Sequence, residues 1–150
     1  MENTIIEIIK GMLAPGIMIS ACGLLLLGMN NKYSLVVNRI RTLNNEFRLT
    51  HKIEKERHDC ILMQLPLLVE RMKMIRNAVW LYTIGIAMFI FSIFSIGFYL
   101  LYSNAIIYQI ISISIFVIAL ISVLIGVFYA AKEVRLGFKI LKIETKNLDY

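Results

Sequence analysis

The sequence contains few of the residues on which covalent cross-linking and most reaction chemistry depend. It has two cysteines, two histidines, two prolines and one tryptophan in 150 residues. Cys22 lies in an apolar run and Cys60 in a polar one, so the pair cannot form a disulfide framework across two environments. No catalytic, cofactor or nucleotide motif stands out, and we therefore expect a protein that is not an enzyme and holds no cofactor.

Charge is also scarce, and it is unevenly distributed. Charged residues make up 17% of the chain and hydrophobic residues 59%, with a mean hydropathy of +0.74. These values lie outside the range of soluble globular domains and indicate a membrane protein surrounded by lipid. The net charge is +6, but the basic residues lie between and after the apolar runs. We interpret them as a signal of topology, and expect no nucleic-acid binding.

Three apolar runs are long enough to cross a membrane. The first, about residues 12–29, spans roughly 27 Å as a helix, close to a hydrocarbon core of about 30 Å. The second and third, about residues 77–102 and 105–131, contain no charged residue, and only Ser103 and Asn104 separate them. So short a connection predicts an antiparallel pair of spans.

The residues before the first span predict a separate surface segment. Residues 1–11 interleave isoleucines with charged side chains, a pattern typical of one or two helical turns lying on a membrane. Pro15 follows at the point where the chain enters the bilayer. We expect it in a first helical turn, where the N–H that proline lacks would have no partner.

The distribution of lysine and arginine predicts the orientation. Ten basic residues lie between the first and second spans and five follow the third, whereas Lys10 alone precedes the first. Because basic loops stay on the cytoplasmic side, we expect the N-terminus outside and the C-terminus inside.

The segment between the first two spans predicts paired helices, since residues 30–76 contain no glycine and one proline. Its apolar residues recur at alternating steps of three and four, at Tyr33, Val36, Ile40, Leu43 and Phe47, and again at Ile61, Leu65, Leu68, Met72, Ile75 and Val79. Both patterns are typical of coiled-coil seams. We expect a cytoplasmic helical hairpin that reverses near residues 50–59, with Pro66 bending the second helix without ending it.

The fold class predicted is therefore an all-α membrane protein with three transmembrane helices, forming one membrane domain over residues 1–150. The tail, residues 132–150, keeps helical spacing at Val134, Phe138 and Leu141. We expect it to continue the third span as a cytoplasmic helix and to pack against the two arms through this spacing.

Small and hydroxyl residues form stripes along the spans, and these are the first candidate site. The stripes are Gly16, Ser20 and Gly23 in the first span and Ser112, Ala119, Ser122 and Gly126 in the third. One interpretation is close helix packing in lipid, with hydroxyls bonding across the contact. The other is that one stripe lines a narrow uncharged pore in a ring of subunits.

A second candidate site lies two to three turns beyond the first span, at Asn38, Arg39, Arg41 and Asn44. Either these are solvated topological charges with nearby glutamate partners, or they form a gate or a patch for anionic lipid or ligand.

Two further clusters contain metal-ligating or nucleophilic residue types but predict no site. His51, Glu54 and His58 share one helical face, without a fourth ligand at fixed spacing. His58, Asp59 and Cys60 are sequence neighbours that do not converge on a substrate.

Several motifs together carry a family resemblance. They are Met12-Leu13-Ala14-Pro15, Ile19-Ser20-Ala21-Cys22-Gly23, Arg39-Ile40-Arg41-Thr42-Leu43-Asn44 and Ile75-Arg76-Asn77-Ala78, with Gln64 and Arg71 between them. With them the chain resembles the bacterial domain-of-unknown-function family 2721 over nearly its whole length. The resemblance implies a small three-span protein of the bacterial inner (plasma) membrane and brings no established activity.

Two functional hypotheses follow. The arms carry long apolar seams that one chain would struggle to cover, so we expect a homo-oligomer, as a closed ring with membrane lipids around it. Such a ring would be a channel with a basic cytoplasmic vestibule. The alternative is a non-conducting scaffold whose cytoplasmic arms bind another protein.

Overall fold

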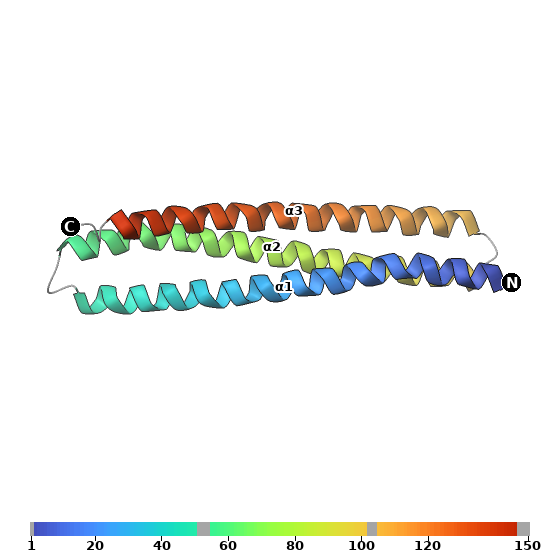
Figure 1. Cartoon of the computed structure of the whole chain (residues 1–150), viewed down its shortest axis with the longest axis horizontal. Helices are drawn as coiled ribbons and strands as arrows, with labels where there is room; N and C mark the ends of the chain where they lie inside the picture. The colour runs from blue at the N-terminus through green and yellow to red at the C-terminus, as the bar shows by residue number, and fades with distance from the viewer. Residues whose placement is uncertain (1, 51–54, 102–104, 147–150) are drawn as a thin grey trace. The chain divides into compact units, whose positions relative to one another are not determined.

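The computed structural model describes residues 2–50, 55–101 and 105–146, and all of them are helical (Figure 1). Helix α1 is Glu2–Thr50, α2 is Lys55–Leu101 and α3 is Ala105–Lys146. Each helix contains a stretch that is long and apolar enough to cross a membrane. The chain is therefore an all-α, multi-pass membrane protein.

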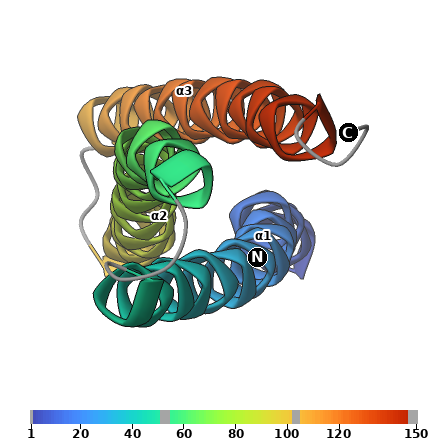
Figure 2. The ribbon, with the colours of Figure 1, turned by 90° about the vertical axis from the view of Figure 1, so that its left-hand side faces the viewer.

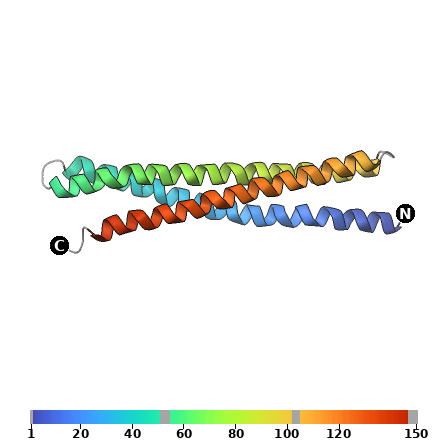
Figure 3. The same cartoon turned by 90° about the horizontal axis from the view of Figure 1, so that it is seen from above.

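The helices contribute to two compact units. The apolar unit comprises Met1–Leu27 and Val79–Gly126, and the basic unit comprises Gly28–Ala78 and Val127–Tyr150. Each unit contains segments of all three helices. Consecutive helices run in opposite directions, as the colours show from blue through green to red (Figures 1, 2 and 3). Among the described residues, every charged one except Glu2, Glu7 and Lys10 belongs to the basic unit.

The buried residues of each helix recur every seven positions, which is the period of helices that pack along one another over many turns. In α1 they are Pro15, Cys22, Met29, Val36 and Leu43. In α2 they are Ile61, Leu68, Ile75, Tyr82 and Phe89, with a second row at Gln64, Ala78, Gly85 and Ser92. In α3 they are Ser112, Ala119, Gly126, Glu133 and Ile140, with Ser122 beside them.

In the apolar unit the three helices meet at a small apolar core. Cys22 of α1, Phe89 of α2 and Ala119 of α3 are fully buried there. The rings of Phe89 and Phe116 lie 5.5 Å apart at 56°, a tilted arrangement that aromatic pairs favour. Large apolar side chains on the outside, such as Leu24 and Ile106, are more than 70% exposed within one chain. Lipid is the surrounding that suits them.

Two predictions about prolines had different outcomes. Pro66 lies inside α2 and does not end it, as expected. Pro15 was expected in a first helical turn, and this is wrong, because α1 begins at Glu2 and Pro15 lies buried in its interior. Residues 2–11 likewise belong to α1 rather than to a separate surface segment. Membrane helices tolerate such prolines because neighbouring groups satisfy the backbone that the ring leaves unbonded.

The seam predicted for α2 is wrong in one of its two rows. Ile61, Leu68 and Ile75 are buried as expected, whereas Leu65, Met72 and Val79 are only half-buried. The second buried row runs instead through polar and small residues, including Gln64 and Ala78. In α1, Val36 and Leu43 are buried as predicted, while Tyr33 is 39% exposed. Apolar spacing cannot identify a buried row that is polar.

The packing face predicted for the end of α3 is also wrong. Val134, Phe138 and Leu141 are 56%, 70% and 56% exposed, and the buried residues are Glu133 and Ile140. The helix does continue past its apolar stretch, to Lys146, as expected. The opposite side of α3 is buried because Glu133 can occupy the core there, where its carboxylate is paired with Lys32 of α1 and Arg71 of α2.

Candidate functional site

Glu133 is the most deeply buried charged residue among those whose side chains the structure describes. Its side chain is 0% exposed, in the same seven-residue row as Gly126 and Ile140. Removing an ionised carboxylate from water costs several kcal/mol, so such a residue persists only with close partners of opposite charge. The partners of Glu133 therefore define the site.

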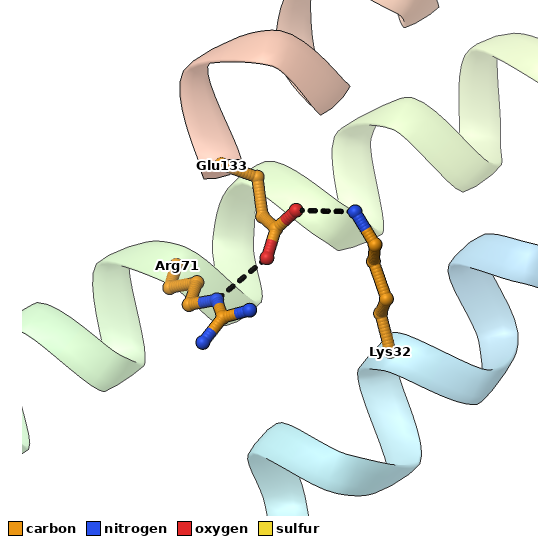
Figure 4. A network of polar contacts seen from close by, with 3 residues as sticks. All are labelled: Lys32, Arg71 and Glu133. Carbon is orange, nitrogen blue, oxygen red and sulfur yellow. Dashed lines mark hydrogen bonds and ion pairs between the residues drawn. The ribbon is translucent and has the colours of Figure 1, made fainter. Parts of the chain in front are cut away.

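Two cations bind the two oxygens of this carboxylate (Figure 4). Lys32 Nζ donates to Oε2 at 3.0 Å, and Arg71 Nε donates to Oε1 at 2.6 Å. Both are charge-assisted hydrogen bonds, the stronger class of hydrogen bond in proteins. Because Lys32 is in α1 and Arg71 in α2, Glu133 of α3 ties all three helices of the basic unit together. We refer to these three residues as the charged triad.

Gly137 provides the space in which Arg71 lies. A Cβ added at Gly137 would lie 3.3 Å from Arg71 Cζ and 3.5 Å from each Nη. The guanidinium group therefore lies over the α3 backbone one turn beyond Glu133. Two positions of α3, one charged and one without a side chain, together hold Arg71.

The charged triad lies just beyond the uncharged stretches of its helices. Lys32 is the first charged residue after residues 11–31 of α1, and Glu133 is the second after residues 105–131 of α3. The side chains of Lys32 and Arg71 are 40% and 27% exposed, in contrast to the enclosed carboxylate. Each carboxylate oxygen already accepts a hydrogen bond from a cation, so the arrangement suits clamping helices better than transferring protons.

The α3 stripe expected from the sequence lies in the contact between α3 and α2. Ser112, Ala119, Ser122 and Gly126 are all buried. The Ser92 and Ser112 hydroxyls are 3.2 Å apart, and Ser122 Oγ donates to the Leu81 carbonyl at 3.0 Å. Small residues and shared hydroxyls of this kind let helices approach closely in lipid.

Glycine is required twice in that contact. A Cβ at Gly126 would lie 2.7 Å from Tyr82 Cε1, and one at Gly85 would lie 2.7 Å from Val123 Cγ2. Real Cβ atoms do not approach other heavy atoms so closely, so a larger residue at either position forces a neighbour to move.

The α1 stripe faces outward. Ser20 and Gly23 are exposed and Gly16 is half-buried. A Cβ added at Gly16 or Gly23 would have no neighbour within 4 Å. The structure therefore does not bring the two small-residue stripes together.

The remaining candidates are mostly exposed. Asn38, Arg41 and Asn44 are exposed and Arg39 is half-buried. The Asn38 carbonyl accepts a hydrogen bond from Thr42 Oγ1 of the next turn at 3.0 Å. His51 and Glu54 lie outside the described residues, as do the side chains of His58 and Cys60. Among the side chains that are described, no three histidine, cysteine or acidic residues form a metal-binding group.

Sequence reasoning missed the charged triad. Lys32 was counted as a topological charge, Arg71 was counted as one and noted with the family motifs, and Glu133 was not singled out. One signal was available: Glu133 continues the seven-residue spacing of Ser112, Ala119 and Gly126. A charge at the next position of a small-residue row predicts a buried, paired carboxylate.

A comparison with known families adds one finding to this geometry. The family model described as "Protein of unknown function (DUF2721)" matches residues 12–143. The chain belongs to the DUF2721 family. The match includes Lys32, Arg71, Glu133 and Gly137, so the whole site lies within the DUF2721 region. No curated protein and no solved structure gives a match.

Proposed function

We propose that this DUF2721 protein is a non-conducting, non-enzymatic protein of the bacterial inner membrane whose basic unit binds another protein in the cytoplasm. The observation that carries the proposal is the charged triad. Within one chain, Lys32 of α1 and Arg71 of α2 bind Glu133 of α3, so the sides of the three helices that face one another in the basic unit are already paired. The outer faces of that unit are then available to a partner.

The burial of the seams supports the same proposal. Val36 and Leu43 of α1 and Ile61, Leu68 and Ile75 of α2 are each no more than 3% exposed in a single chain. A ring of subunits is therefore not needed to cover them. These five residues therefore give no reason for assembly, whereas other residues of the predicted seams, among them Tyr33, Leu65 and Met72, are left partly exposed.

The packing of α3 also favours a non-conducting protein. The Ser112 and Ser122 hydroxyls point to α2, where both form hydrogen bonds. To line an axial pore they would have to turn away from α2 and lose the hydrogen bonds that now join α2 and α3.

The distribution of charge supports a cytoplasmic location for the basic unit. Outside it, the described charged residues are Glu2, Glu7 and Lys10 alone. Basic segments flanking membrane spans are retained on the cytoplasmic side.

Photo-cross-linking in cells tests the proposed function. A photoreactive phenylalanine analogue would replace Leu35, Met63 or Phe138 of the basic unit, and Phe91 of the apolar unit as the control, each at least 64% exposed. We expect a discrete adduct with a different protein from at least one basic-unit position and none from Phe91. Adducts with a second copy alone, or with other proteins from Phe91 alone, would contradict the proposal.

A second candidate function, a homo-oligomeric pore, is favoured by the outward-facing α1 stripe. Exposed Ser20 and the open positions Gly16 and Gly23 allow another helix to approach closely. In a ring built through this stripe, Ser20 would line the axis, and Asn38, Arg39, Arg41 and Asn44 would form a basic gate. Unitary currents that change on Ser20→Leu, together with the mass of a ring, would establish this candidate.

A further inference from the structure

We propose that the outer face of α3 in the basic unit binds an amphipathic helix with acidic flanks from a partner protein. This face consists of an outer stripe, Ala131, Val134, Phe138 and Leu141, and a basic row, Lys132, Arg135 and Lys139. The inference rests on the proposed docking function and names the surface and the chemistry of the partner.

The outer stripe is the side of α3 that its own bundle leaves uncovered. Phe138 is 70% exposed, whereas Ile140, two residues later, is 7% exposed. Two residues turn about 200° around a helix, so the two side chains lie on nearly opposite sides. All four residues of the outer stripe are exposed.

The spacing of the outer stripe suits a helical partner. Its residues follow one another at steps of three, four and three, as the buried residues Ile61, Gln64 and Leu68 of α2 do at steps of three and four. A stripe with these steps faces a neighbouring helix along its whole length, about 15 Å from Ala131 to Leu141. An amphipathic helix placed there would be a fourth member of the basic unit.

Charge selects among such helices. The basic row runs beside the outer stripe, and Lys132, Arg135 and Lys139 are all exposed. A helix with glutamate or aspartate beside its apolar residues would pair with this row, whereas a basic helix would be repelled. Complementary charge of this kind fixes partner choice and register more than it adds affinity.

A second copy of the chain fits the outer face of α3 less well than an acidic helix does. In the described part of the basic unit, the acidic residues are Glu46, Glu56, Asp59, Glu70, Glu133 and Glu144, and Glu133 is enclosed within its own chain. Basic residues of the same unit outnumber them more than twofold. A copy would therefore bring mainly like charge to the basic row.

A membrane surface is also a poorer occupant. Helices that lie on membranes present an apolar face between polar or basic borders. The outer stripe has a basic border on one side only, because Gly137 and the buried Glu133 follow on the other. In addition, α3 is one helix without proline from Ala105 to Lys146, so it does not turn at Lys132 to lie along a membrane surface.

Peptide binding tests the inference directly. The full chain would be reconstituted in nanodiscs of zwitterionic lipid and titrated against two fluorescent designed helices. Both have leucine at the a and d positions, and one has glutamate and the other lysine at e and g. We expect the acidic helix to bind at least about tenfold more tightly than the basic one. Its affinity should fall as salt rises from about 0.05 M to about 0.5 M.

Two matched pairs of variants locate the binding. Phe138→Ser should weaken the binding of the acidic peptide about tenfold. Leu35→Ser, at an α1 position that is also 70% exposed, should leave the affinity for this peptide unchanged. Changing Lys132, Arg135 and Lys139 together to glutamate should reverse the preference between the two peptides. Changing Arg41 and Lys73, two exposed cations on the other helices, to glutamate should leave that preference as it is. All of these side chains are exposed, and unchanged helicity would show that each variant folds.

Each contrary outcome identifies what has failed. Equal binding of both peptides, or equal weakening by Phe138→Ser and Leu35→Ser, overturns the inference. Phe138-dependent dimerisation of the chain, or Phe138-dependent binding to phosphatidylserine vesicles without binding of the acidic peptide, also overturns it, in favour of a second copy or a membrane. Cross-linking at Met63 tests the docking function without involving the outer stripe. A partner trapped there while the peptides fail would retain the function and discard this inference.

Discussion

At the scale of single residues, Glu133 has the largest consequence, because one carboxylate joins three helices. Its hydrogen bonds to Lys32 and Arg71 are 3.0 and 2.6 Å long, and it has no exposure to solvent. A buried pair is weak evidence of net stabilisation, yet breaking one leaves an uncompensated charge. Glu133 therefore acts mainly by fixing which faces of the three helices meet.

Removing this carboxylate gives the first prediction. Glu133→Ala should lower the free energy of unfolding by about 3 kcal/mol. This value is at the low end of the range for breaking a buried ion pair, because the cations left behind, Lys32 and Arg71, are partly exposed to water. Unfolding in bicelles measures it. Glu70→Ala, at an exposed glutamate of the same unit, is the control and should change stability by less than about 0.5 kcal/mol. Equal effects would show that Glu133 has no special role.

Replacing the whole charged triad gives the second prediction. Changing Lys32, Arg71 and Glu133 together to methionine removes the pairing and its desolvation cost at once. We expect this variant to be as stable as the native chain, within about 1 kcal/mol, although Glu133→Ala alone is not. If the triple variant is as unstable as Glu133→Ala, the ion pairs themselves stabilise the unit.

At the scale of elements, the sequence predicted the three apolar stretches because they lack charge over long distances. It also predicted that α3 continues past its span. It did not predict the second buried row of α2, because Gln64 is polar and Ala78 is small, and a search for large apolar residues passes over them. Nor did it predict the buried face at the end of α3, where Val134 and Phe138 gave the apolar spacing. Which charges pair depends on residues of other helices, and no pattern within one helix contains that information.

Close helix approach gives the third prediction. Gly126→Ala should destabilise the apolar unit by about 1–3 kcal/mol, because the new Cβ would lie 2.7 Å from the buried ring of Tyr82. Unfolding in bicelles with Gly23→Ala as the control checks it, since no neighbour lies within 4 Å of a Cβ there. Should the two variants unfold alike, the α2–α3 contact would not depend on glycine.

At the scale of the whole molecule, the chain has three helices that can cross a membrane, and its charged residues are concentrated in one of its two units. The sequence predicted this concentration of charge because residues 11–31 and 77–131 contain no charged residue, whereas the segments between and after them contain many. The orientation and the partner of the basic unit depend on surroundings outside the chain, namely the membrane and the other proteins beside it.

Orientation gives the fourth prediction. In a chain whose Cys22 and Cys60 are changed to serine, Lys10→Cys should react with an impermeant maleimide in intact cells, and Lys73→Cys only after the membrane is opened. Both lysines are exposed. The expected pattern follows from retention of basic segments in the cytoplasm. Labelling of Lys73→Cys in intact cells would place the basic unit outside and remove the cytoplasmic partner from the account.

The central claim is that a single chain packs its own seams and pairs its charged triad. The outer faces of its basic unit are then exposed to a partner, and the chain forms no conducting ring. Native mass spectrometry of the purified full chain, released from mild detergent, tests it most directly. Because the seams and the charged triad are satisfied within a single chain, the account predicts the mass of one chain. A closed ring of several chains, stable in the same detergent, would contradict it and favour the pore built through Gly16, Ser20 and Gly23.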